Sequence, residues 1–91
     1  MEIRIIQKMR RSQNIITFYS PYSFESDFRL TAEISRISEE DILEEEFLLI
    51  LYDDEGEEFK SISFGSFSEA CRSAHDEFAS LMIHNWSETR S

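Results

Sequence analysis

Apolar and polar residues alternate cleanly over residues 27–35 of the chain. The apolar positions there are Phe28, Leu30, Ala32 and Ile34, and the residues between them are polar. Side chains of a strand point to opposite faces in turn, so this period of two predicts a strand with one buried and one solvated face.

Two further strands are predicted nearer the N-terminus. Residues 2–9 combine Ile with Arg and Lys in a short run, and residues 14–20 are rich in β-branched and aromatic side chains, which favour strands. The polar residues 10–13 between these runs predict a turn. Pro21 lacks a backbone N–H and is expected to end the second strand.

Residues 46–52 and 57–64 predict a β-hairpin. The first segment is a nearly continuous apolar run, typical of a central strand. The second alternates, but its first aromatic residue is out of phase, which predicts a bulge near Lys60 or Ser61. Gly56 lies in the short segment between the two strands and supplies the positive φ that a tight turn requires.

An amphipathic helix is predicted from Phe67 to about Trp86. Ser66 and Glu69 have the spacing of a capping box, and apolar residues then recur at intervals of three and four. Helix and hairpin together are expected to form the core, with these buried positions: Phe47, Leu49, Leu51, Ile62, Phe64, Cys71, Ala74, Phe78, Leu81 and Met82.

A second, shorter helix is predicted between Ser38 and Glu45, because Ser38 can cap it and acids are favourable in a first turn. The predicted fold is therefore α+β. An antiparallel sheet of four or five strands has one long C-terminal helix packed on one face and a short acidic helix between strands. Residues 1–91 are expected to form one compact acidic domain.

The net charge of −10 is unevenly distributed. Residues 1–36 carry six bases and four acids, a balance of +2, whereas residues 37–91 carry three bases and fifteen acids, a balance of −12. Such a field repels nucleic acid and anionic membranes and attracts basic surfaces. We therefore expect no direct nucleic-acid binding, no membrane binding and a basic protein partner.

Composition narrows the class of protein further. One cysteine precludes an internal disulfide, and no apolar run has the roughly 18 residues of a membrane span. Basic residues interrupt the apolar residues of the N-terminal segment, which is unlike a signal peptide. A cytoplasmic protein is expected.

Catalytic and metal-binding patterns are weak. Cys71 and His75 are one helical turn apart, but a zinc site needs a third and fourth ligand and no other cysteine exists. Residues 53–58 resemble a calcium loop only in composition, since Gly56 is fourth rather than sixth. Glu58 and Lys60 match the E-x-K element of some nucleases, but no basic groove accompanies them. We expect no enzyme activity, no metal and no cofactor.

The acids themselves are the candidate partner-binding residues. They are concentrated between residues 39 and 58, where eleven of twenty residues are acidic: Glu39, Glu40, Asp41, Glu44, Glu45, Glu46, Asp53, Asp54, Glu55, Glu57 and Glu58. Same-face residues repeat at about 6.6 Å on a strand, and neighbours on a helix face lie about 5–6 Å apart. Carboxylates held in this way can approximate the phosphates of DNA, which carries one charge per about 1.7 Å of helix axis.

The acidic clusters EEDILEEE and DDEGEE, in a small α+β chain, resemble those of phage DNA-mimic proteins of the anti-restriction type. Small anti-CRISPR proteins are a second comparison. The resemblance covers size, charge and the acidic clusters, with no motif matched residue by residue. It implies an inhibitor that helps a phage evade host defence by binding the nucleic-acid-binding surface of a host restriction, chromatin or defence protein.

Two alternatives stay open. One is an acidic adaptor or assembly protein whose basic partner does not compete with DNA; in the other, the acids serve only solubility. Self-association as a homodimer is also expected, because Phe18, Tyr19, Tyr22, Phe24 and Trp86 form more aromatic surface than one helix can cover.

Overall fold

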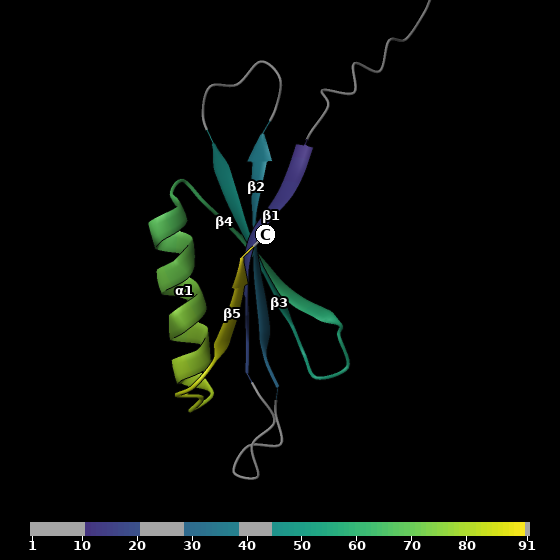
Figure 1. The fold of residues 1–91 in the computed structure, drawn as a ribbon, viewed down its shortest axis with the longest axis vertical. Coiled ribbons are helices and arrows are strands. Elements are labelled where there is room, and N and C mark those ends of the chain that lie inside the picture. Colours follow the sequence, from purple (N-terminus) through teal and green to yellow (C-terminus); the bar gives the residue numbers. More distant parts are fainter. Residues whose placement is uncertain (1–10, 21–28, 39–44, 91) are drawn as a thin grey trace, which may run out of the picture.

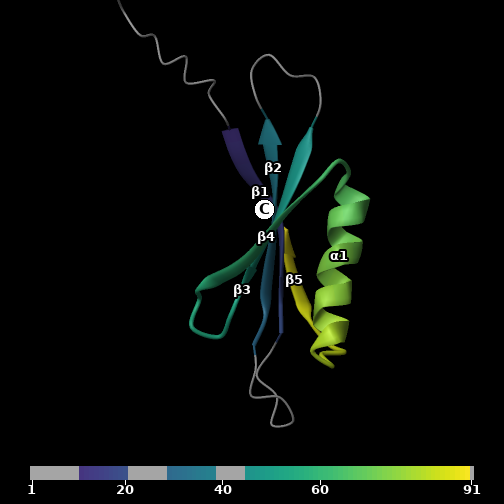
Figure 2. The ribbon, with the colours of Figure 1, turned by 180° about the vertical axis from the view of Figure 1, so that it is seen from behind.

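The computed structural model describes residues 11–20, 29–38 and 45–90. Their elements are β1 (Arg11–Tyr19), β2 (Thr31–Ser38), β3 (Glu46–Tyr52), β4 (Glu58–Phe64), α1 (Phe67–Ser80) and β5 (Ser87–Arg90). The strands form one antiparallel sheet in the order β4-β3-β2-β1-β5. Helix α1 lies on one side of this sheet, as both views show (Figures 1 and 2). The α+β class with one helix on one sheet face is thereby confirmed.

The N-terminal half differs from the prediction in its boundaries. Strand β1 begins at Arg11, so the polar residues that predicted a turn form the start of a strand instead. Polar residues are tolerated in this strand because the side chains of Ser12 and Gln13 are exposed, while their backbones pair with Ile37 and Arg36 of β2. The strand predicted at residues 2–9 lies outside the described residues.

The short acidic helix is not part of the described fold. Ser38, expected to cap it, is the last residue of β2, and residues 39–44 lie outside the described ranges, so this helix stays a prediction. Strand β2 continues three residues beyond the clean alternation, through the buried Ile37. Pairing with Phe47 and Glu46 at the start of β3 extends β2 this far.

The predicted hairpin is confirmed, with its bulge displaced by one residue. Leu51 pairs with Lys60 and Tyr52 pairs with Glu58, which leaves Phe59 as the additional residue. Its side chain is 50% exposed. The bulge restores the phase of the strand, as the sequence required, but it does so at the aromatic residue itself rather than at Lys60 or Ser61.

Helix α1 begins as predicted and ends earlier. The Ser66 side chain accepts a hydrogen bond from the backbone N–H of Glu69 at 3.2 Å. At the other end, the N–H of Met82 donates to the carbonyl of Ala79 and the N–H of Ile83 to that of Phe78. Together with φ of 59° at Met82, these two bonds form a Schellman motif that stops the helix.

The core lies between α1 and the near face of the sheet. Of the predicted positions, Phe47, Leu49, Leu51, Ala74 and Phe78 are buried. Ile62, Phe64 and Cys71 are half-buried. Leu81 and Met82 were predicted wrongly, since the helix has ended and both are exposed.

Strand β5 was absent from the sequence prediction, which continued the helix to Trp86. Its four residues are all exposed and pair with Tyr19 to Ile16 of β1. Trp86 leads into it by stacking on Phe78, with ring centroids 5.4 Å apart. Packing of one aromatic residue therefore brings the C-terminal segment back to the sheet.

Candidate partner-binding face

The turn between β3 and β4 is organised by the carboxylate of Asp53. Its Oδ1 accepts hydrogen bonds from the backbone N–H groups of Glu55 and Glu57, each at 2.9 Å. The Asp53 N–H donates to the carbonyl of Glu57, and Gly56 adopts the expected positive φ of 79°. Asp53 thus holds the turn, and its neighbours Asp54, Glu55 and Glu57 project into solvent.

Strand register divides the sheet residues between two faces. Paired residues of neighbouring strands share a face, and Leu51, Ala32 and Phe18 mark the face that α1 covers. We call the opposite side the open face. Its strand residues are Ser12, Asn14, Thr17, Tyr19, Thr31, Glu33, Ser35, Ile37, Glu46, Leu48, Ile50, Tyr52, Glu58, Ser61, Ser63, Ser87 and Thr89. Ser35 and Ile37 are the buried residues of this set.

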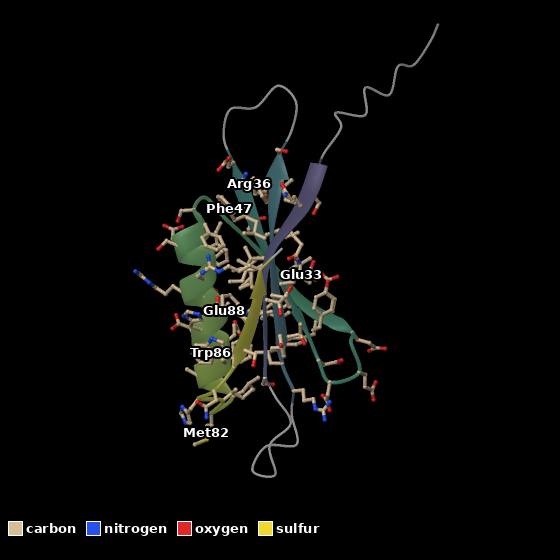
Figure 3. The ribbon with its side chains drawn as sticks, viewed as in Figure 1. Glu33, Arg36, Phe47, Met82, Trp86 and Glu88 are labelled. Carbon is tan, nitrogen blue, oxygen red and sulfur yellow. The ribbon has the colours of Figure 1, made fainter. Side chains whose placement is uncertain are left out.

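Three carboxylates share the open face. Glu33 lies opposite Ile50 in the middle of the sheet, Glu58 lies opposite Tyr52, and Glu46 begins β3 at the other end. Figure 3 shows Glu33 on the side of the sheet away from α1. Glu46 and Tyr52 are six positions apart on β3, so these carboxylates span about 20 Å along the sheet.

Strand register places two carboxylates near Tyr52 on the open face. Glu58 of β4 pairs with Tyr52, and Glu33 of β2 is two residues along from Thr31, the partner of Tyr52 in β2. Partial burial raises the pKa of the Tyr52 hydroxyl above its ordinary value, and the carboxylates of Glu33 and Glu58 raise it further, because a nearby negative charge disfavours the phenolate.

The cations of the strands lie on the other side. Arg36 is in register with Phe47, Lys60 with Leu51 and Arg90 with Ile16, all on the face that α1 covers. Lys60 forms an ion pair with Glu77 of α1, and Nη2 of Arg90 lies 3.8 Å from Oε2 of Glu88. Among the strand side chains that the structure describes, the open face holds no Lys or Arg. Arg29 precedes β2 and is outside this set.

Only some of the predicted partner-binding residues lie on the open face. Glu46 and Glu58 lie on the open face, and Glu46 accepts a hydrogen bond from Ser63. Glu45 is exposed, and its Oε1 lies 3.9 Å from Nε of Arg36. The turn acids are at the far end of β3 from Glu45 and Glu46 (Figure 1). Glu39, Glu40, Asp41 and Glu44 lie outside the described residues.

Glu33 is the site residue that the sequence analysis did not include. It is outside the dense acidic stretch, so a search for charge clusters passes over it. The alternation in residues 27–35 already placed Glu33 on the polar side of its strand. Its position between the two acidic groups becomes visible only when β2 is paired with β3.

His75 and Cys71 lie in packing contacts within the fold. His75 lies between the rings of Phe18 and Trp86, with centroids 5.1 Å and 4.9 Å away. Burial raises the pKa of the Cys71 thiol, Arg90 opposes that rise and Glu88 adds to it. In the described part of the chain, no three His, Cys, Asp or Glu residues are grouped so that they could hold a metal ion.

No protein-family model matches the chain, and no curated protein or solved structure matches it. Within the described ranges, no helix combines the length and apolarity that crossing a membrane requires.

Proposed function

We propose that this protein is a cytoplasmic DNA-mimic inhibitor, which binds the nucleic-acid-binding surface of a host protein through the open face and the adjoining β3–β4 turn. The observation that carries the proposal is the separation of charge across the sheet. Glu33, Glu46 and Glu58 project from one face, while Arg36, Lys60 and Arg90 project from the other. A basic surface that approaches the open face meets only carboxylates among these charged groups.

Rigidity of the acids favours the same function. Glu33 lies mid-strand, and the turn that presents Asp54, Glu55 and Glu57 is fixed by the hydrogen bonds of Asp53. Acids held on ordered backbone lose less conformational freedom on binding than acids on a flexible tail. The resemblance to anti-restriction proteins of phages supplies the class of target, a restriction or other defence protein that binds DNA.

The test begins with capture of a binding partner from host lysate at low salt, followed by competition. Labelled duplex DNA is bound to the captured target, and the present protein is added in increasing amounts. Displacement of DNA, with affinity that falls as salt rises, is the expected result, because exposed charges form the contact. A stable ternary complex of target, DNA and this protein would contradict mimicry.

A pair of matched variants locates the interface. Replacing Glu33, Glu46 and Glu58 by Gln removes three charges from the open face, and we expect it to weaken displacement at least about tenfold, the equivalent of 1.4 kcal/mol. The control replaces Glu69, Asp76 and Glu88 by Gln or Asn, which changes net charge equally on the helix side of the molecule. Equal losses in both variants would show that only net charge matters.

One observation favours the second candidate function, an acidic adaptor that binds a basic partner without displacing DNA. Leu48, Ile50 and Tyr52 lie in the same face as the carboxylates and are only half-buried. A partner that combines basic and apolar side chains would cover them, whereas a DNA-binding groove need not. The ternary complex described above is the result expected from the adaptor.

A further inference from the structure

Strand β4 forms one edge of the sheet and is incompletely covered. Its inner side pairs with β3, and the sheet order places no strand beyond it within the described residues. Ile62 and Phe64 face the helix side, in register with Leu49 and Phe47. Those two partners are buried, at 0% and 6% exposure, but Ile62 and Phe64 are only half-buried. Strand β4 is thus an edge strand whose two apolar side chains on the helix side stay partly exposed.

We propose that β4 pairs antiparallel with β4 of a second copy of this chain, about a two-fold axis at Ile62. Edge strands present backbone N–H and C=O groups that another strand can pair with. In this register Ile62 lies opposite Ile62 of the second copy. Phe64 lies opposite Lys60, and Ser63 lies opposite Ser61. The apolar side chains of the two copies then cover one another on the helix side.

The chemistry of this register is favourable at each position. The directly opposed pairs contain no like charges, and the serines of the open face can exchange hydrogen bonds. Lysine commonly protects an edge strand from pairing. Here the ammonium group of Lys60 instead binds Glu77 on α1, so it is held towards the helix. The edge therefore lacks its usual protection between Lys60 and Phe64.

The bulge and the net charge limit the strength of this dimer. Phe59 interrupts the regular strand, so only the five residues from Lys60 to Phe64 pair. Each copy carries −10, so the two repel one another at low ionic strength. Added salt screens that repulsion and should strengthen the dimer, which is opposite to the salt dependence expected for binding a basic partner. The dimer does not rest on the proposed function.

Sedimentation velocity on the full chain tests the proposal, at protein concentrations from about 5 to 200 µM, because dimerisation follows mass action. The wild type should form a dimer whose fraction increases with sodium chloride. Ile62→Lys places two ammonium groups at the two-fold axis and should raise the dimer dissociation constant at least about tenfold. Thr89→Lys makes the same charge change on the opposite edge strand and should leave the dissociation constant within about twofold.

A disulfide provides a second measurement that does not depend on the folding of the lysine variant. In a Cys71→Ser background, Ile62→Cys brings two Cβ atoms to about 4.5–5.5 Å at the axis, close enough for a bond after small adjustment. Oxidation should yield a covalent dimer, and Thr89→Cys in the same background should not. A wild type that stays monomeric at high salt, an Ile62→Lys dimer of wild-type strength, or equal crosslinking of both cysteine variants would each overturn the proposal.

Discussion

Met82 occupies a backbone conformation that suits glycine better than methionine. Its φ is 59°, and its side chain is 79% exposed, so it contributes little packing in return for the strain. Met82→Gly should stabilise the fold by about 0.5–1 kcal/mol, since glycine adopts a positive φ without steric cost. Chemical denaturation measures the change, and Met82→Ala is the control, because alanine retains the strain. An equal gain from both variants would contradict this explanation.

Phe78 is the side chain on which the core most depends. It is fully buried and stacks on Trp86. Phe78→Ala should reduce the free energy of unfolding by about 3–5 kcal/mol, because it removes buried surface and leaves a cavity. Leu81→Ala, three residues further on, should cost less than about 1 kcal/mol because Leu81 is 40% exposed. Similar losses at both positions in urea titration would show that the helix phase is misassigned.

The surroundings of Phe78 and Met82 show where helical periodicity predicts burial correctly and where it does not. The spacing of Ala74 and Phe78 identified the buried side of α1 correctly. The same spacing includes Leu81 and Met82, and both residue types favour helices, so nothing in the pattern ends the helix. The end is set by the left-handed backbone of Met82 and by the burial of Ile83, which are tertiary effects.

Among the elements, the β3–β4 turn depends on the side chain of Asp53, which the sequence predicted as a turn residue and as a binding residue. Asp53→Ala removes the acceptor of two backbone N–H groups and should cost about 1 kcal/mol, in the range of a lost helix cap. Asp53→Asn keeps an acceptor oxygen and should lose less. Denaturation of both variants against Asp54→Asn, a neighbouring charge change without these bonds, separates the two contributions. Equal effects of all three would assign the loss to charge alone.

The proximity of Glu33 to Tyr52 on the open face can be tested by titrating Tyr52. The raised pKa of Tyr52 means that the folded chain holds this proton more tightly than the unfolded chain. Its contribution to stability is therefore complete below pH 10.0 and is lost as pH rises through the pKa of the folded state. In Glu33→Gln the pKa of Tyr52 should move towards its ordinary value, as followed by NMR of labelled tyrosine. An unchanged pKa would place Glu33 away from Tyr52.

Strand pairing decides which parts of the site could be predicted from the sequence. Alternation in residues 27–35 and the apolar run of β3 identified the strands that carry Glu33 and Glu46. Local pattern does not give register, and register is what brings Glu33 and Glu58 to the same ring and turns the cations to the opposite face. Strand β5 has four polar residues and no periodicity, so only its pairing with β1 identifies it.

For the molecule as a whole, charge is separated by sheet face as well as by position in the sequence. The excess of acids after residue 36 indicated an acidic C-terminal half. In the folded sheet, strands from both halves contribute to the acidic open face, through Glu33 as well as Glu46 and Glu58. The ion pairs of Lys60 with Glu77 and Arg36 with Glu45 offset part of the acidic charge elsewhere. The carboxylates that share the open face are therefore expected to repel one another.

That repulsion should be visible in the salt dependence of stability. The midpoint of thermal unfolding should rise with sodium chloride, because screening weakens repulsion within a chain of charge −10. Replacing Glu33 and Glu58 by Gln should raise stability at low salt by up to about 1 kcal/mol and reduce the rise. The control replaces Glu77 and Glu88, which have cationic partners, by Gln and should lower stability at low salt. If the two double variants respond alike to salt, net charge rather than its separation between the faces governs the stability of this fold.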